Sequence, residues 1–156
     1  MLIKEITQED IPVWLALAHE GDAAVARLVP DLAVFYTSFK EYMARKIAQH
    51  EAYKATDIIS KKCLGIIAFS KNNNRISFIG ITGKSSNFTG IGKTLMEFAL
   101  KQLDRSKPIT ANVIDCNASM FKKECALYES FGFADTHDKI MDSGVPAILL
   151  KKEPDK

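Results

Sequence analysis

The chain has few cysteines, and their spacing is not typical of a crosslinked or metal-binding protein. Cys63, Cys116 and Cys125 are the only three in 156 residues, and no CxxC pair occurs. An odd number of scattered cysteines argues against a disulfide framework and against a zinc site. We therefore expect three small buried apolar side chains and no bound metal.

Long apolar runs are also missing. No segment reaches the ~20 consecutive apolar residues that cross a bilayer. The first residues, Met1-Leu2-Ile3-Lys4-Glu5, lack the basic and apolar regions of a signal peptide. We expect a cytoplasmic protein that does not use a membrane as a partner.

Neither sign of charge dominates the chain. The 21 Lys and Arg residues nearly balance the 19 Asp and Glu residues, for a net charge of +2, and like charges do not gather in blocks. This pattern argues against the basic patches of nucleic-acid-binding proteins, so we expect no nucleic-acid partner. A chain of this length can bury a core of its own, and residues 1–156 are expected to form a single domain.

The segments that are present alternate between helical and strand periodicity, which predicts a mixed sheet packed by helices on both faces. The expected strands are Leu2–Ile6, Tyr53–Ile59, Cys63–Phe69, Ile76–Ile81, Ile109–Ile114, Phe133–Ile140 and Val145–Lys151. The expected helices begin near Thr7, run from about Pro30 to His50, end near Leu103 after a glycine turn, and run from about Ser119 to Ser130. The fold class is α/β (α+β), with a mixed, mostly antiparallel central sheet of six to seven strands flanked by about four helices.

The segment Asn87-Phe88-Thr89-Gly90-Ile91-Gly92-Lys93-Thr94 has the features of a phosphate-binding turn. It joins the strand at residues 76–81 to an amphipathic helix and leaves two glycines at the junction. The first N–H groups of a helix lack intrahelical partners and carry the positive end of its dipole, and glycine has no Cβ to hold an anion away. This pattern predicts a pyrophosphate site.

The same residues are close to a nucleotide-binding P-loop. Gly92-Lys93-Thr94 matches its ending, and Val113-Ile114-Asp115 is similar to its magnesium-side acid. Asn87 stands where that loop needs its first glycine, and a side chain there hinders the turn around the β-phosphate. A nucleotide hydrolase is therefore a less favoured alternative.

A second motif, Ala126-Leu127-Tyr128-Glu129-Ser130-Phe131-Gly132-Phe133, lies about forty residues further on. Here a helix ends on glycine and turns into a strand. A Gly-x-Gly turn after a strand, followed by a strand, a helix and a Leu-Tyr-Glu-x-x-Gly-Phe ending, resembles the GNAT superfamily of N-acetyltransferases. The resemblance covers roughly Cys63 to Lys151, and the order of the preceding elements also suits that fold.

The resemblance implies an enzyme that moves the acetyl group of acetyl-coenzyme A directly to an amine, without a metal. The strand ending at Ile81 would splay from its neighbour and pair with the pantetheine arm, and one of its N–H groups would polarise the thioester carbonyl. Tyr128 would protonate the leaving thiolate. The cofactor-binding residues carried over are Ile79, Ile81, Asn87, Phe88, Thr89, Gly90, Ile91, Gly92, Lys93 and Asn117, with Lys84 as an electrostatic supplement. The acceptor would be a small-molecule or peptide amine, and a homodimer is a further expectation because such folds commonly dimerise.

The chain departs from the family pattern at three points. Asn87 replaces the usual Arg or Gln, the loop before Gly90 is about one residue longer, and Tyr128 lies about four residues too far beyond Asn117. Four residues are close to one helical turn of ~3.6 residues, so Tyr128 can still face the same side.

The base that deprotonates the amine is not identified by the sequence, because Arg75 to Gly92 contain no acidic residue. Water and five side chains stay open as candidates: Asp115, Asp135, His137, Glu20 and Asp22. A cationic acceptor is a hypothesis that depends on Asp22, Asp31, Asp135, Asp138 and Asp142 lying near the opening. The missing strand glutamate and the altered loop also keep a second class open, a non-catalytic module that binds acyl-coenzyme A as a sensor.

Overall fold

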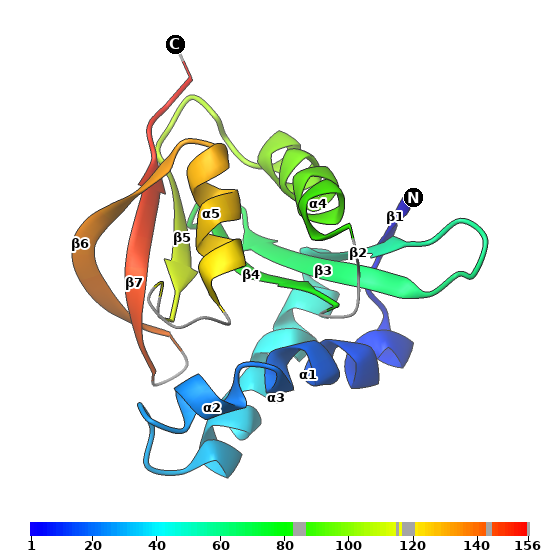
Figure 1. The fold of residues 1–156 in the computed structure, drawn as a ribbon, viewed down its shortest axis with the longest axis horizontal. Helices are drawn as coiled ribbons and strands as arrows, with labels where there is room; N and C mark the ends of the chain where they lie inside the picture. Colours follow the sequence, from blue (N-terminus) through cyan, green and yellow to red (C-terminus); the bar gives the residue numbers. More distant parts are fainter. Residues whose placement is uncertain (83–86, 115, 117–120, 143–144, 156) are drawn as a thin grey trace.

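The computed structural model describes residues 1–82, 87–114, 116, 121–142 and 145–155, which form a seven-stranded sheet with helices on both faces (Figure 1). The strands are β1 (Leu2–Glu5), β2 (Ala52–Thr56), β3 (Cys63–Ser70), β4 (Arg75–Ile81), β5 (Ile109–Val113), β6 (Phe133–Asp142) and β7 (Val145–Lys152). The helices are α1 (Ile11–His19), the one-turn α2 (Asp22–Val25), α3 (Leu32–Ala48), α4 (Phe88–Gln102) and α5 (Lys122–Ser130).

The sheet is mixed and mostly antiparallel, so the fold class predicted from the sequence is confirmed. Its order is β1-β2-β3-β4-β5-β7-β6; the β4–β5 pair is parallel and the other neighbours are antiparallel. A parallel pair needs a crossover connection, and α4 is that crossover between β4 and β5.

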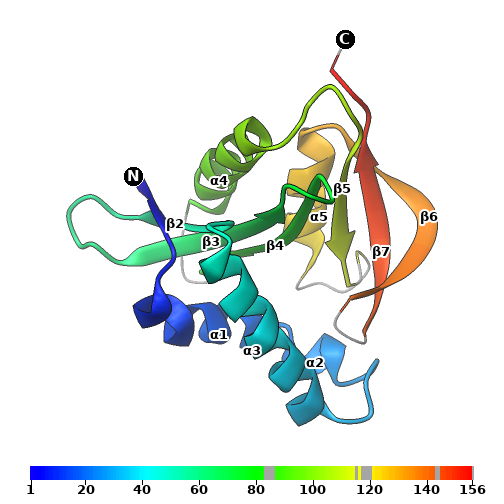
Figure 2. The same cartoon turned by 180° about the vertical axis from the view of Figure 1, so that it is seen from behind.

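Helices α1 and α3 cover one face of the sheet, and α4 and α5 cover the other (Figures 1 and 2). Two hydrophobic clusters hold these layers together. On one face α1 and α3 contribute Trp14, Phe39 and Met43, and on the other α4 contributes Leu95 and Met96, all of them buried. The central strand β3 is buried on both faces, so residues 66–69 form a continuous apolar run instead of alternating with polar residues.

Local hydrogen bonds explain where the element ends differ from the prediction. The predicted strand Tyr53–Ile59 is wrong at its end: β2 stops at Thr56 because the Asp57 carboxylate accepts hydrogen bonds from the backbone N–H groups of Ile59 and Ser60 at 2.9 and 2.8 Å. These two bonds hold the chain in a turn. The long helix is also shorter than predicted, because Asp31 caps it by accepting a hydrogen bond from Ala33 N at 2.9 Å.

The parallel pair β4–β5 separates soon after it begins. Its register is confined to Arg75 with Thr110 and Ile76 with Ala111. Beyond that point β4 continues to pair with β3, and β5 continues to pair with β7. The strands therefore splay apart toward Ile81, as the family resemblance implied.

The cysteines differ from the sequence-based expectation. Cys116 and Cys125 form a disulfide with their Cα atoms 5.8 Å apart, whereas Cys63 is free and half-buried. The expectation of three unpaired thiols was wrong because the chain folds back after β5, which brings a residue in the β5–α5 connection next to α5. Spacing in the sequence does not reveal such a reversal.

Two absences hold for the described part of the chain. No helix there combines the length and apolar character needed to cross a bilayer. The same residues contain no group of three His, Cys, Asp or Glu side chains that could hold a metal ion.

Candidate functional site

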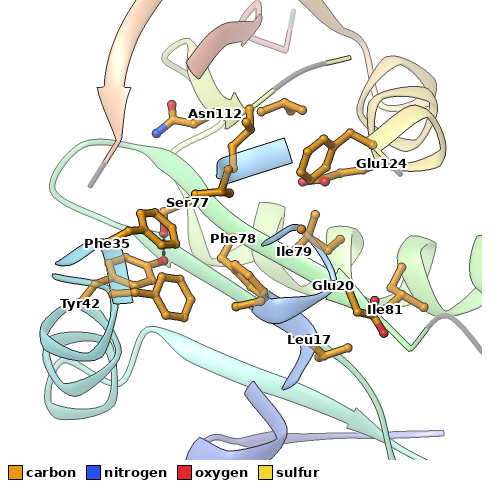
Figure 3. A pocket seen from close by; sticks show the side chains of 18 of the residues that line it. Leu17, Glu20, Phe35, Tyr42, Ser77, Phe78, Ile79, Ile81, Asn112 and Glu124 are labelled. Atoms are coloured by element: carbon orange, nitrogen blue, oxygen red, sulfur yellow. Dashed lines mark hydrogen bonds between the residues drawn. The ribbon is translucent and has the colours of Figure 1, made fainter. Parts of the chain in front are cut away.

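A cavity of about 200 Å³ lies where β4 and β5 splay apart (Figure 3). Residues from both helical layers contribute to its wall. They include Leu17 of α1, Glu20 just after α1, Phe35, Phe39 and Tyr42 of α3, residues 77–81 of β4, Asn112 and Val113 of β5, Phe88 of α4, Phe121, and Glu124 of α5.

The cavity reaches both faces of the sheet. Phe78 packs against the α1 and α3 cluster, whereas Ile79 and Ile81 belong to the α4 and α5 cluster, and all three line the cavity. Successive residues of a strand point to opposite faces. A molecule in the splay can therefore be approached from the α1–α3 side while it contacts the α4–α5 side.

The N-terminus of α4 lies next to this opening, with Phe88 in the cavity wall. The first helical bond runs from Ile91 N to Asn87 O at 3.0 Å, so the N–H groups of Phe88, Thr89 and Gly90 precede the helical ladder. Such groups are donors for an anion at the positive end of the helix dipole. The expected turn is corrected in one respect, because both glycines lie inside the first turns of α4 and not before the helix.

The two glycines of α4 have different surroundings. A Cβ at Gly90 would lie 2.5 Å from Asn87 Oδ1, whereas a Cβ at Gly92 would lie 2.7 Å from Leu127 Cδ2 and 3.2 Å from Ile81 Cδ1. Gly92 is thus needed for close packing of α4 on α5 and β4. Gly90 leaves room for the Asn87 side chain.

Three other residues expected to bind the cofactor, Thr89, Ile91 and Lys93, are described by the structure but do not line the cavity. Ile91 is buried in the core, Thr89 is exposed, and Lys93 extends into solvent, 3.9 Å from Glu97. Asn117 and Lys84 lie outside the described residues.

Aromatic rings form the wall of the cavity on the α3 side. Phe39 lies 5.9 Å from Phe78 and 5.6 Å from Tyr42 between ring centroids, and Phe35 lies 6.1 Å from Phe39. The Tyr42 hydroxyl shares a hydrogen bond with the Ser77 hydroxyl. This wall is apolar apart from that one bonded pair.

Two carboxylates lie on the other side of the cavity, Glu20 and Glu124 (Figure 3). Glu20 is exposed at the end of α1, whereas Glu124 is only partly accessible. Burial raises the pKa of the Glu124 carboxyl to about 8. Asn112 adds a buried Oδ1 atom that accepts no hydrogen bond from the described residues.

Of the base candidates named from the sequence, Glu20 lines the cavity. Asp22 instead accepts a hydrogen bond from Tyr36 and lies 2.8 Å from His19 Nδ1. Asp135 and His137 are exposed neighbours on β6, and Asp115 lies outside the described residues. Of the five aspartates expected near the opening, Asp22, Asp31, Asp135 and Asp138 do not line it, and the side chain of Asp142 lies outside the described part of the structure.

Tyr128 is fully buried, with its ring 5.3 Å from that of Phe133, and does not line the cavity. Glu124 precedes it by four residues on α5, so the two side chains share a face of the helix. The sequence analysis did not single out Glu124. Glu124 could have been found from the sequence, because it lies four residues before Tyr128, which the sequence analysis had already named as a site residue.

Comparisons with known proteins agree on the fold. The family profile described as an acetyltransferase (GNAT) domain matches residues 4–154. Among curated proteins, none matches the chain in sequence.

Solved structures similar to this chain include three bacterial acetyltransferases. A GNAT-family acetyltransferase from Staphylococcus aureus has 14% identity and a TM-score of 0.67, with 99% of each chain covered. A ribosomal-protein-alanine N-acetyltransferase from Brucella melitensis has 15% identity and a TM-score of 0.64, with 98% of this chain and 99% of that chain covered. A GNAT-family acetyltransferase from Bacillus cereus has 13% identity and a TM-score of 0.62, with 99% and 98% covered. At these identities the similarity concerns the fold.

Proposed function

The chain belongs to the GNAT acetyltransferase family, and on that premise we propose that it transfers the acetyl group of acetyl-coenzyme A to an amine. The observation that carries the proposal is the splay of β4 from β5 beside the N-terminus of α4. A strand edge that has lost its partner and a helix end with free donors are the two features that an extended thioester with a pyrophosphate needs.

Three features of the described backbone support a fit to coenzyme A. The N–H groups of Phe88, Thr89 and Gly90 precede the first helical bond and are available to the pyrophosphate oxygens. Gly90 has no Cβ, and the Asn87 side chain occupies the space that a Cβ there would take. From Ser77 to Ile81, β4 has no β5 partner, so its backbone groups on that edge are available to the amide groups of the pantetheine arm.

Catalysis in this arrangement depends on donors aimed at the charge that develops during transfer. A backbone N–H of β4, in the strand that holds Ile79 and Ile81, would stabilise the oxyanion of the thioester carbon. One preorganised donor of this kind is worth roughly 3 kcal/mol of transition-state energy. Tyr128 would give its proton to the leaving thiolate, supported by its position on the face of α5 that also carries Glu124.

A two-step measurement tests the proposal. Calorimetric titration with acetyl-coenzyme A is expected to show binding without added metal. A free-thiol assay across primary amines is then expected to show release of coenzyme A that depends on the amine. Absence of binding would contradict the proposal at its first step.

A second candidate is a non-catalytic module that binds acyl-coenzyme A. The observation that favours it is the full burial of Tyr128 away from the cavity wall. This candidate predicts tight binding of acetyl-coenzyme A and no thiol release with any amine. The same two-step measurement therefore separates it from the enzyme.

A further inference from the structure

We propose that the acceptor is a small primary amine with an aromatic body, and that Glu124 takes the proton from its ammonium group. This inference rests on the proposed acetyl transfer and adds the class of acceptor and its base. Three features of the cavity carry it: the sign of its charges, its aromatic wall and the place of Glu124 on α5.

The charges of the cavity wall favour a cation. Among the described residues, the ionisable side chains that line it are Glu20, Glu124 and Tyr42, with no Lys, Arg or His. Lys123, next to Glu124 in the chain, is exposed, and its Nζ lies 5.6 Å from the centroid of the Phe88 ring. The exposed Glu20 carboxylate attracts an ammonium group, as does Glu124 where the pH exceeds its raised pKa of about 8, and the buried Asn112 Oδ1 offers a hydrogen-bond acceptor.

The α3 side favours an apolar body that carries that ammonium group. Phe35, Phe39, Tyr42 and Phe78 all contribute to the wall. Aromatic rings at centroid distances of 5.6–6.1 Å already stack and tilt against one another there, and a further ring can join such a cluster. The volume of about 200 Å³ lies below the ~300–1,000 Å³ of most ligand sites, which suits a small molecule.

Glu124 is the carboxylate placed for proton transfer. It lies on α5 one turn before Tyr128 and lines the same cavity as Phe121 and Phe88. Glu20 is exposed at the end of α1 and so keeps its water shell. The elevated pKa of Glu124, about 8, lies closer to that of an alkylammonium, ~10, than an ordinary carboxyl does.

The step balances in protons and bonds. The ammonium group gives one proton to the ionised Glu124, and the resulting amine nitrogen forms a bond to the thioester carbon. The carbon–sulfur bond then breaks, and the thiolate takes a proton from Tyr128, which recovers one from the new amide nitrogen. Glu124 finally loses its proton to solvent, so the products are the amide, the free thiol of coenzyme A and one proton.

The acceptor class is tested with matched amines on the full chain. Initial rates of thiol release are measured with 2-phenylethylamine, with ethylamine, which has the same amine without the ring, and with spermidine. Burial of a ring is worth about 1.5–3 kcal/mol, so kcat/KM for 2-phenylethylamine should exceed that for ethylamine by about 10- to 150-fold. Equal values for 2-phenylethylamine and ethylamine, or a higher value for spermidine, would overturn the acceptor class.

The role of Glu124 is tested with Glu124→Gln beside the matched control Glu129→Gln, an exposed glutamate on the same helix. Glu124→Gln should lower kcat/KM for 2-phenylethylamine by about a hundredfold or more and abolish the inflection near pH 8. Binding of acetyl-coenzyme A and the melting curve, measured on both variants, report on folding. A variant that keeps the wild-type rate, or loses rate with its pH profile unchanged, would overturn the base role.

The experiments distinguish a wrong acceptor class from a wrong assignment of acetyl transfer. If wild type releases no thiol with any amine, the transfer itself is contradicted. Calorimetric binding then still tests the cavity, because 2-phenylethylamine should bind to wild type at least about tenfold more tightly than ethylamine does. Binding that is no tighter than that of ethylamine would overturn the aromatic acceptor as well.

Discussion

Tyr128 and Glu124 share a face of α5 but differ in access, because Glu124 lines the cavity and Tyr128 is buried behind it. A substitution that removes only the phenolic oxygen of Tyr128 therefore tests chemistry with little change in shape. Tyr128→Phe should lower kcat by about a hundredfold, since general acids contribute typically 10²–10⁴-fold. The affinity for acetyl-coenzyme A, measured by calorimetry, should change by less than about twofold.

The control is Tyr53→Phe on β2, whose ring contacts Phe69 and Phe98 and does not line the cavity. It should leave both quantities unchanged. Equal loss of kcat and of binding in Tyr128→Phe, or no loss at all, would remove Tyr128 from the acid role.

Glu124 also predicts a pH dependence of stability. Its folded pKa of about 8 lies above the ordinary value of 4.5, so the folded state holds this proton more tightly than the unfolded chain does. The corresponding stability is present below about pH 4.5 and is lost as the pH rises toward 8. Glutamine cannot ionise, so the melting temperature of Glu124→Gln relative to wild type should rise over this window.

Each kcal/mol of this difference moves the melting temperature of a chain of this size by about 2–4 °C. Calorimetric melts at several pH values between 4.5 and 9 measure it, with Glu129→Gln as the control whose offset should not change. An offset for Glu124→Gln that is the same at both ends of the pH range would contradict the buried, ionisable carboxyl.

Among the elements, α4 carries two glycines in its first turns: Gly92 packs closely on α5 and β4, and Gly90 is proposed to contribute to coenzyme A binding. Gly92→Ala places a Cβ 2.7 Å from Cδ2 of the buried Leu127, and overpacking of this kind costs about 1–3 kcal/mol. Alanine gains ~1 kcal/mol in a helix, so the net loss is up to about 2 kcal/mol. Denaturant unfolding should show a less stable protein.

Gly90→Ala should act on binding more than on stability. Its Cβ meets the movable Asn87 side chain, so unfolding stability should stay within about 1 kcal/mol of wild type while the affinity for coenzyme A falls about tenfold. The reverse pattern, with Gly90→Ala unstable and Gly92→Ala unable to bind, would contradict this division of roles.

The disulfide between Cys116 and Cys125 ties α5 to the segment that follows β5. It closes a loop with a sequence separation of 9, for which the chain-entropy relation gives about 2–3 kcal/mol. Cys116→Ser should therefore lower the melting temperature by roughly 5–10 °C, and Cys63→Ser, which removes the free thiol, is the control. Three titratable thiols in the unreduced wild-type protein would contradict the crosslink.

The sequence predicted those elements whose apolar pattern is visible within one segment, and it missed features that depend on specific hydrogen bonds or on residues far apart in the chain. Helical and strand periodicity placed α3, β3 and β4 closely, because each presents an apolar face to a cluster. The end of β2 was missed because the Asp57 turn is a local hydrogen-bond effect, and the disulfide was missed because it depends on a chain reversal. Glu124 was missed because the cavity that it lines is formed by residues far apart in the chain, such as Phe35 and Val113.

In the whole molecule, two hydrophobic clusters pack on the two faces of one sheet. The cavity lies where β4 splays from β5 and reaches both faces. In the proposed reaction, the thioester and the amine would approach one another from opposite sides of β4. The family match over residues 4–154 and the similar solved folds agree with such an architecture. The aromatic and acidic residues that line the cavity are the ones proposed to contact the amine.

The proposed reaction moves an acetyl group from coenzyme A to an amine in this cavity. It is tested directly by mass spectrometry of a reaction with acetyl-coenzyme A that carries carbon-13 in its acetyl group, with 2-phenylethylamine as acceptor. Labelled N-acetylated amine and an equal amount of free coenzyme A thiol are expected. Label that stays on coenzyme A, or appears only in free acetate, would contradict it.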